Sequence, residues 1–413
     1  MVEPKYNEIM IAKNTFPLLF IILIGVDFFG LFPRTTSLLL LPFALYFVSV
    51  THNHKLIFKK NIFFYIFFAS LSTITCYYYR GQSFFESFTC PAFREYYFLF
   101  LYFIFCYNKP KIEYVENIIL KSFYIFWGLY MLQYILYPTK IIDILAGEGT
   151  NRFRIIGEIV NSLSYFICLN RFLLHGGNKN VIIMICSILV LFLQGFRAML
   201  FAIVVASAIV YIKINGFAAV KKHVIMIFAI TFLGILLSQV SIVKNSVERM
   251  IEANQTQTYS NDNYIRMVQL DYYMNSHFKS NIERFLGSGQ PGYQSSYGKE
   301  MIKKGDNTDY EIHIKGGYLD WGLIGQSWMV GSITILIFYI MMFKCIYISW
   351  KSGKNNLYVV GWYIFLIIIS FSNMEVHRTG SIVYHTLVFY IVTALYNKNE
   401  QHFILVKDKI LHE

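Results

Sequence analysis

Residues 187–207 read SILVLFLQGFRAMLFAIVVAS, an apolar run with one charged residue, Arg197. About 20 apolar residues are enough for a helix to cross the hydrocarbon core of a bilayer. A guanidinium group at the centre of such a helix costs about 2.5–3.5 kcal/mol. The stretch therefore predicts membrane-spanning helices, and it requires something that offsets the charge of Arg197.

The whole chain has the same character. It is 56% hydrophobic, 18% aromatic and 15% charged, whereas soluble domains are about 25% charged. Its mean hydropathy is +0.48. We predict an all-α, polytopic membrane protein. The net charge of +12 does not indicate a nucleic-acid partner, because many of the lysines fall in short loops between apolar runs, as the positive-inside rule describes.

The apolar runs predict about twelve spans of roughly bilayer length. We place them at 16–33, 36–50, 62–79, 93–108, 115–137, 155–174, 181–196, 198–214, 223–243, 317–343, 356–373 and 379–396. The chain then divides into nine spans in 1–243, one large polar loop in 244–316, and three spans with a tail in 317–413.

The lysines predict the orientation. With both termini in the cytoplasm, the loops richest in lysine fall inside, and the loop 244–316 falls on the outer, periplasmic side. Loops of this length are usually functional or disordered. The stretch NYIRMVQLDYYMNSHF (263–278) has apolar residues at helical spacing, and GSGQPGYQSSYG (287–298) predicts a turn. We expect a small ordered cap over the membrane surface.

Arginine is distributed differently from lysine. The short outer loops carry Arg34, Arg80, Arg94, Arg152, Arg154, Arg197 and Arg378. The topology rule counts lysine and arginine together, so it does not explain this preference. A guanidinium group binds phosphate through two hydrogen bonds, which predicts a lipid phosphate or pyrophosphate ligand on the outer face. The alternative is that each arginine reaches ordinary lipid headgroups or pairs with a nearby carboxylate. We favour it for the first three arginines, and Glu86 and Glu95 lie near two of them.

Metal and thiol chemistry have no clear signal. The six cysteines form no C-x-x-C pair, and most lie in apolar runs, so we expect small core residues. Cys76 and Cys90 are the one pair that could form a disulfide, and we do not expect it. The outer loops hold no cluster of histidine and carboxylate residues with metal-ligand spacing. We therefore predict chemistry without a metal or another cofactor.

Five segments, taken in order, resemble one family. They are RIIGEIVNS (154–162), LQGFRAML (193–200), NYIRMV (263–268), LGSGQPGY (286–293) and EIHIKGGYLDWGLIG (311–325). Together they resemble the superfamily of O-antigen polymerases and O-antigen ligases of bacterial envelopes, over residues 152–326.

The resemblance implies a reaction. Members of this family move a glycan from undecaprenyl pyrophosphate to an acceptor at the periplasmic face of the inner membrane. Polymerases lengthen a chain of repeat units, and ligases transfer the finished chain to lipid A–core. The resemblance implies a lipid-linked glycan donor, with a chain-length regulator and a flippase as partners. A transporter of the same lipid is a further alternative, but the polar residues gather in one outer loop and favour an enzyme.

The resemblance also assigns residues. Arg154 resembles the arginine that precedes a glycine at the start of a span, and Arg152 stands beside it. Arg197 is similar to the arginine of a Ser-Arg motif, although Phe196 replaces the serine. We predict that these three arginines bind pyrophosphate.

Catalysis is assigned to Arg266, early in the large loop, and to His313, which precedes the segment Gly322–Gly325. A histidine with an ordinary pKa near 6.5 suits the general base that deprotonates an acceptor hydroxyl. Ile314 stands where the family has a polar residue. The trio Glu375, His377 and Arg378 is a secondary candidate site, whereas His277 is expected to have no catalytic role.

Overall fold

The computed structural model describes residues 40–51, 56–90, 93, 95–136, 139, 145–146, 153–154, 158–216, 265–302, 314–371, 376 and 381–412. Over these residues the chain is helical, apart from one antiparallel pair of two-residue strands, β1 (Leu145–Ala146) and β2 (Phe153–Arg154). The predicted all-α class is therefore confirmed. The spans predicted at 16–33 and 223–243 lie outside the described residues.

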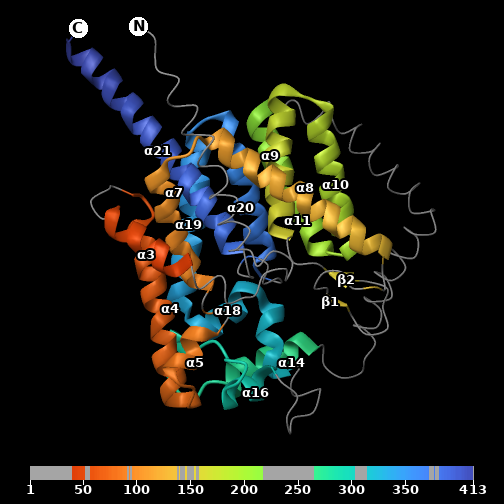
Figure 1. The fold of residues 1–413 in the computed structure, drawn as a ribbon, viewed down its shortest axis with the longest axis vertical. Coiled ribbons are helices and arrows are strands. Elements are labelled where there is room, and N and C mark those ends of the chain that lie inside the picture. The colour runs from red at the N-terminus through yellow and green to blue at the C-terminus, as the bar shows by residue number, and fades with distance from the viewer. Residues whose placement is uncertain are drawn as a thin grey trace.

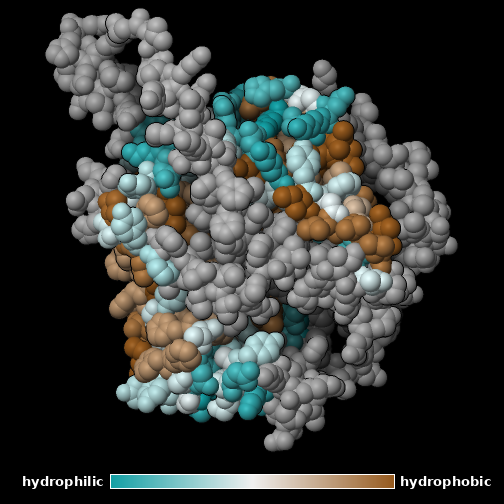
Figure 2. All heavy atoms as spheres, in the orientation of Figure 1, coloured by the Kyte–Doolittle hydropathy of each residue, from teal (hydrophilic) through white to brown (hydrophobic). Residues whose placement is uncertain are grey.

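Four helices have the length and composition that a membrane span requires: α4 (Lys59–Arg80), α8 (Ile112–Leu136), α11 (Arg197–Asn215) and α19 (Ser332–Lys351). The other helices of the main body are α3 (Leu40–Val50), η3 (Glu95–Phe100), α7 (Leu101–Asn108), α9 (Glu158–His175), α10 (Asn178–Gln194), η6 (Lys354–Asn356), α20 (Leu357–Ile369) and α21 (Ser381–His412). Figure 2 shows hydrophobic side chains on the flanks of the molecule, and hydrophilic ones gathered toward its two ends.

Shorter elements, from the described part of the large loop and its surroundings, pack together in a unit that we call the cap; its place over a membrane surface stays a prediction. They are α5 (Phe84–Thr89), α14 (Ile265–Asp271), a π-helical turn η4 (Tyr272–Ser276), α15 (Asn281–Leu286), α16 (Ser296–Ile302), η5 (Gly316–Trp321) and α18 (Gly322–Val330). The helix predicted from the spacing in 263–278 is present as α14 and η4. In Figure 1 α5, α14 and α16 lie at the end of the molecule opposite the end of α21.

The tenth predicted span, 317–343, is wrong in its boundaries. The chain turns at Gly331, whose φ is 92°, and α19 begins after it. Two glycines allow the turn to pack against the cap. A Cβ on Gly287 would lie 2.4 Å from the carbonyl oxygen of Met329, and one on Gly331 would lie 2.7 Å from that of Leu286. Residues 316–330 therefore belong with the cap, although their apolar composition resembles that of a span.

The described helices define two poles. At the first, Lys344 Nζ donates to the carbonyl of Ile57 (3.2 Å), and Lys354 Nζ donates to the carbonyl of Ile214 (2.7 Å). The start of α4 therefore lies beside α19, and the end of α11 lies beside η6. We call this end the lysine-rich pole; it includes Lys59, Lys60, Lys179, Lys213, Lys344, Lys351 and Lys354.

The cap pole is the opposite end. There α4 ends at Arg80, α11 begins at Arg197 and α19 begins at Ser332. Thr75 in α4 donates from its hydroxyl to the carbonyl of Gly287, and Lys279 Nζ donates to the carbonyl of Tyr79 near the end of α4 (2.6 Å). The large loop is thus joined to α4 at this pole.

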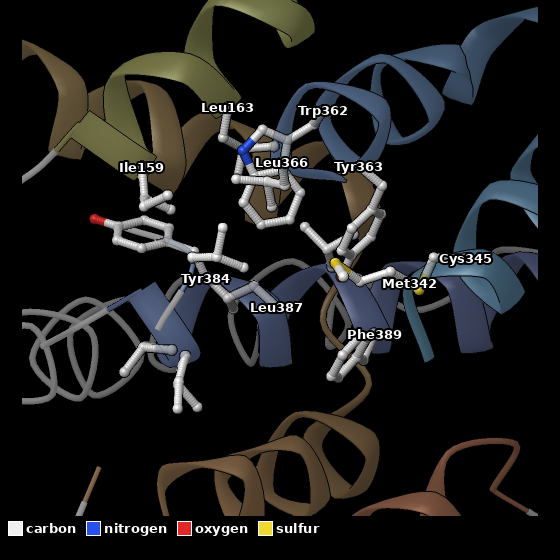
Figure 3. Close-up of a cluster of buried hydrophobic side chains, with 14 of the residues drawn as sticks. Ile159, Leu163, Met342, Cys345, Trp362, Tyr363, Leu366, Tyr384, Leu387 and Phe389 are labelled. Carbon is white, nitrogen blue, oxygen red and sulfur yellow. The ribbon is translucent and has the colours of Figure 1, made fainter. Parts of the chain in front are cut away.

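Helix α20 lies in the core of the body. It packs against α9, α11 and α19, and a Cβ on Gly361 would lie 2.6 Å from the ring of Phe166. Trp362 is fully buried and donates through Nε1 to Ser162 Oγ (3.2 Å). Figure 3 shows Trp362 and Leu366 beside Ile159 and Leu163. This packing fixes α9, which follows strand β2 and its arginine.

Candidate functional site

The structure describes three of the eight candidate site residues. Arg266 lies in α14 and is half-buried, and Arg197 is the first residue of α11 with an exposed side chain. Arg154 is described in its backbone, which pairs with Leu145 in the short sheet. The other candidates lie outside the described residues: Arg152, His313, Glu375, His377 and Arg378.

Two of the predicted segments pack together in the cap. Helix α14, which carries Arg266, lies against η5, which begins three residues after His313. Tyr273 donates from its hydroxyl to the carbonyl of Lys315. The backbone at Gly317 comes so close to α14 that a Cβ there would lie 2.3 Å from the side chain of Gln269. Segments far apart in sequence are therefore brought to one place in the cap.

Asp320 belongs to this contact. Its place just before an apolar run allows two interpretations of the sequence: the carboxylate orients His313, or, as we favour, it only marks the end of the loop. Gln269 Nε2 donates to Asp320 Oδ2 at 3.3 Å, so one oxygen of the carboxylate holds α14 against η5. A contact with His313 remains a prediction, because that histidine lies outside the described residues.

Arg80 forms a buried ion pair that ties α4 to α15. Its Nε lies 2.6 Å from Glu283 Oε1, and the two side chains are 6% and 0% exposed. Arg80 also donates to the carbonyl of His277 and lies 5.3 Å above the ring of Tyr297. The prediction that Arg80 pairs with a carboxylate is confirmed, but the partner is in the large loop. Glu86 instead forms a capping box with Ser83 at the start of α5.

His277 is held in the same buried cluster. Its Nε2 lies 3.0 Å from Ser288 Oγ, and its Nδ1 lies 3.3 Å from the Tyr272 hydroxyl. Burial, and secondly the positive charge of Arg80, lower the pKa of His277 from 6.5 to about 2. A serine next to a histidine has the spacing of a nucleophile and its base. Here both side chains are fully enclosed and the imidazole stays neutral, so the pair is structural.

Buried amides fasten the rest of the glycine-rich stretch. Gln82 Nε2 donates to the carbonyl of Gln290 (2.9 Å), and its Oε1 accepts from the N–H of Gly292 (2.8 Å). Gln290 Nε2 donates to the hydroxyl of Tyr96 (2.6 Å) and to Gln326 Oε1 (2.8 Å). Buried polar groups that are paired in this way specify one arrangement. The cap therefore has a fixed register on α4, η3 and α18.

The structure adds a residue that the sequence reasoning missed, His385 in α21. Its side chain is fully buried, with Nδ1 3.3 Å from the Tyr363 hydroxyl and Nε2 3.2 Å from the carbonyl oxygen of Val376. A carbonyl only accepts, so Nε2 carries the proton and Nδ1 accepts from Tyr363. Figure 3 shows Tyr363 in this core, near Met342 and Phe389.

His385 therefore anchors the connection between α20 and α21. Val376 is buried in that connection, and Glu375 and His377 are its neighbours in sequence. The same connection is held at its start, where the N–H of Leu323 donates to the carbonyl of Ser370 (2.8 Å). The sequence did hold a signal for His385, because a histidine inside a predicted span is a functional candidate by default.

The structure also bears on the cysteines and on the prediction that no metal takes part. All six cysteines are free, and five of them are buried, which confirms their assignment as core residues. Among the described residues, no group of three histidine, cysteine or carboxylate side chains could hold a metal ion. Catalysis without a metal remains a prediction, because His313 and His377 lie outside that part of the chain.

Comparison of the chain with known protein families, with curated proteins and with solved structures found no match.

Proposed function

We propose that this protein is a glycosyltransferase of the bacterial inner membrane. It joins oligosaccharide repeat units carried on undecaprenyl pyrophosphate, at the periplasmic face. The observation that carries the proposal is the packing of α14 against η5, because it brings the helix of Arg266 beside the segment that follows His313, at the pole where α11 begins with Arg197.

The chemistry needs two kinds of group. A lipid-pyrophosphate donor already holds a good leaving group, so the protein must stabilise the departing negative charge and deprotonate the acceptor hydroxyl. Arginines suit the first task, and the start of α11 brings Arg197 to the cap pole. A hydrogen bond to a charged group contributes about 1.5–3 kcal/mol. Such bonds are large enough to offset the cost of holding Arg197 beside hydrocarbon.

The sidedness follows from the two poles. The lysine-rich pole faces the cytoplasm under the positive-inside rule, and the cap pole faces the periplasm. Strand β2, which carries Arg154, leads into the start of α9, and α9 runs from the cap pole to Asn170, whose side chain donates to the carbonyl of Asn355 at the lysine-rich pole (2.7 Å). We therefore assign Arg154 and Arg197 to the outer side of the membrane, together with the cap.

Polymerisation is the reaction we favour, and transfer of the finished glycan to lipid A–core is the alternative. Both reactions use the same donor, and the quoted motifs do not separate them. The acceptor distinguishes them, because a polymerase uses another lipid-linked repeat unit. A chain-length regulator and a flippase would act beside a polymerase.

The test is the glycan profile of a deletion strain. Loss of long chains with a single repeat kept on the core indicates the polymerase, and loss of every repeat from the core indicates the ligase. A strain complemented with His313→Ala, at normal protein level, separates chemistry from transport. A normal profile in the deletion strain would refute both enzymes, and full complementation by a variant that keeps the arginines but lacks both His313 and His377 would favour a transporter.

A further inference from the structure

The outward face of α19 is apolar along its whole length. The exposed side chains recur at alternating spacings of four and three residues, which places them on one face of a helix. They are Leu336 (59% exposed), Ile340 (44%), Phe343 (56%), Tyr347 (59%) and Trp350 (39%). In a membrane such a strip faces acyl chains, and its aromatic end marks the level of the headgroups.

Lysines from three elements gather at that aromatic end. Lys213, in the last turn of α11, holds its Nζ 4.3 Å from the centre of the Trp350 ring. Lys351, at the end of α19, holds its Nζ 4.4 Å from the ring of Tyr347. Lys354, in η6, donates to the carbonyl of Ile214 at 2.7 Å, one residue beyond Lys213. The three ammonium groups thus surround the junction of α11, α19 and η6.

These charges are not balanced by carboxylates in the part of the chain that the structure describes. There, none of Lys213, Lys351 and Lys354 forms an ion pair with an aspartate or glutamate. An ammonium has three N–H donors, so a lysine that already donates to one oxygen keeps donors for another. A cluster of like charges held by aromatic rings and by a backbone carbonyl is stabilised by an anion between them.

We propose that this junction is a binding site for an anionic phospholipid. Its phosphodiester lies among Lys213, Lys351 and Lys354, and its acyl chains lie along the strip from Tyr347 to Leu336. A zwitterionic headgroup fits less well, because its own ammonium meets the same lysines. The proposal needs only that the protein lies in a membrane, and it is independent of the proposed glycosyltransferase activity.

The experiment measures lipid binding by the full-length protein. The protein is delipidated in detergent, and binding of phosphatidylglycerol and of phosphatidylethanolamine is followed by native mass spectrometry. We expect tighter binding of phosphatidylglycerol. Each of Lys213→Ala, Lys351→Ala and Lys354→Ala should weaken it about fivefold, the usual contribution of a basic residue at an anionic surface, whereas Lys213→Arg should keep it.

Lys179→Ala is the matched control. Lys179 is exposed at the same pole and also lies near an aromatic ring, 5.9 Å from the centre of Tyr124, but it belongs to α10. The Lys179→Ala variant should bind phosphatidylglycerol as tightly as the wild type does. Equal loss in the control would show a diffuse surface charge and overturn the site, as would equal affinity for the two lipids. Thermal unfolding without lipid identifies an alanine variant that has simply misfolded. In that case the binding of phosphatidylglycerol by Lys213→Arg, which should equal that of the wild type, tests the site.

Discussion

Loss of the Arg80 guanidinium should loosen the cap, because it would leave Glu283 buried without a partner. The carboxylate of Glu283 is 0% exposed and lies 2.6 Å from Arg80 Nε. Removing one partner from a buried ion pair costs about 3–5 kcal/mol. Arg80→Met should therefore raise the open fraction of the cap by roughly 10²–10⁴-fold.

Cys76 is a built-in reporter of that opening. Its side chain is fully buried, and it packs so closely against Gly289 that a Cβ on this glycine would lie 2.4 Å from the Cβ of Cys76. Lifting residues 287–292 exposes the thiol. The assay is the labelling rate of Cys76 in a protein whose other cysteines are replaced, and the increase in rate reports the increase in the open fraction.

A second substitution isolates the charge. Glu283→Gln keeps an oxygen that can accept from the N–H of Lys279, which now bonds Oε2 at 2.6 Å. The double variant Arg80→Met/Glu283→Gln should label more slowly than Arg80→Met alone, and the full cycle with Glu283→Gln should give a coupling energy of about 2 kcal/mol. Arg284→Met is the control, because Arg284 is exposed on α15, the helix that carries Glu283. Labelling of Arg80→Met at the rate of this control would refute the buried-pair argument.

Four further predictions follow. First, burial lowers the pKa of His277 from 6.5 to about 2, so the contribution of the neutral imidazole to cap stability is present above pH 6.5. Below pH 6.5 the free energy of cap opening should fall by about 1.4 kcal/mol per pH unit. The rate of Cys76 labelling, corrected for thiolate content, measures this free energy, and His277→Gln should flatten its pH dependence. Second, Arg197→Lys should lose most glycan polymerisation although charge is kept, because lysine lacks the planar fork; full glycan length at normal protein level would contradict it. Third, a cysteine at Ser296, which is exposed in the cap, should react with a membrane-impermeant thiol reagent in spheroplasts, whereas labelling only after lysis would invert the orientation. Fourth, His313→Ala should cut turnover by about 10²–10⁴-fold and leave donor binding intact; unchanged turnover would pass the role of base to His377.

The sequence was sufficient wherever an element depends on its own composition. Predicted spans at 62–79, 115–137 and 198–214 correspond to α4, α8 and α11 within a few residues, because length and hydropathy alone decide such helices. The very short connection between the spans predicted at 181–196 and 198–214 is also present. There Gly195 adopts a φ of 70° and ends α10, a conformation that glycine allows.

The sequence was insufficient wherever a residue depends on a distant partner. Arg80 was expected to pair with a carboxylate, but only the fold shows that Glu283 is that partner. Ser295 lies in the stretch for which the sequence predicts a turn, yet its side chain is buried and donates to Gln82 Oε1 (2.7 Å). The tenth span was misplaced for the same reason, since hydropathy does not show that Gly331 must pack against Leu286.

The two residues proposed as the catalytic base are His313 and His377. Each lies within two residues, in sequence, of a described residue whose backbone carbonyl is held from another element. Lys315, two residues after His313, accepts from the Tyr273 hydroxyl, and Val376, directly before His377, lies 3.2 Å from the proton-bearing Nε2 of His385. Rigid support of this kind is what a catalytic group needs. The two anchors differ in their surroundings. Tyr273, in η4, belongs to the cap and directly follows α14, the helix of Arg266, whereas His385 belongs to the core. Tyr273→Phe removes only the first anchor and His385→Phe only the second, so the variant that lowers turnover without lowering donor binding identifies which histidine is the base.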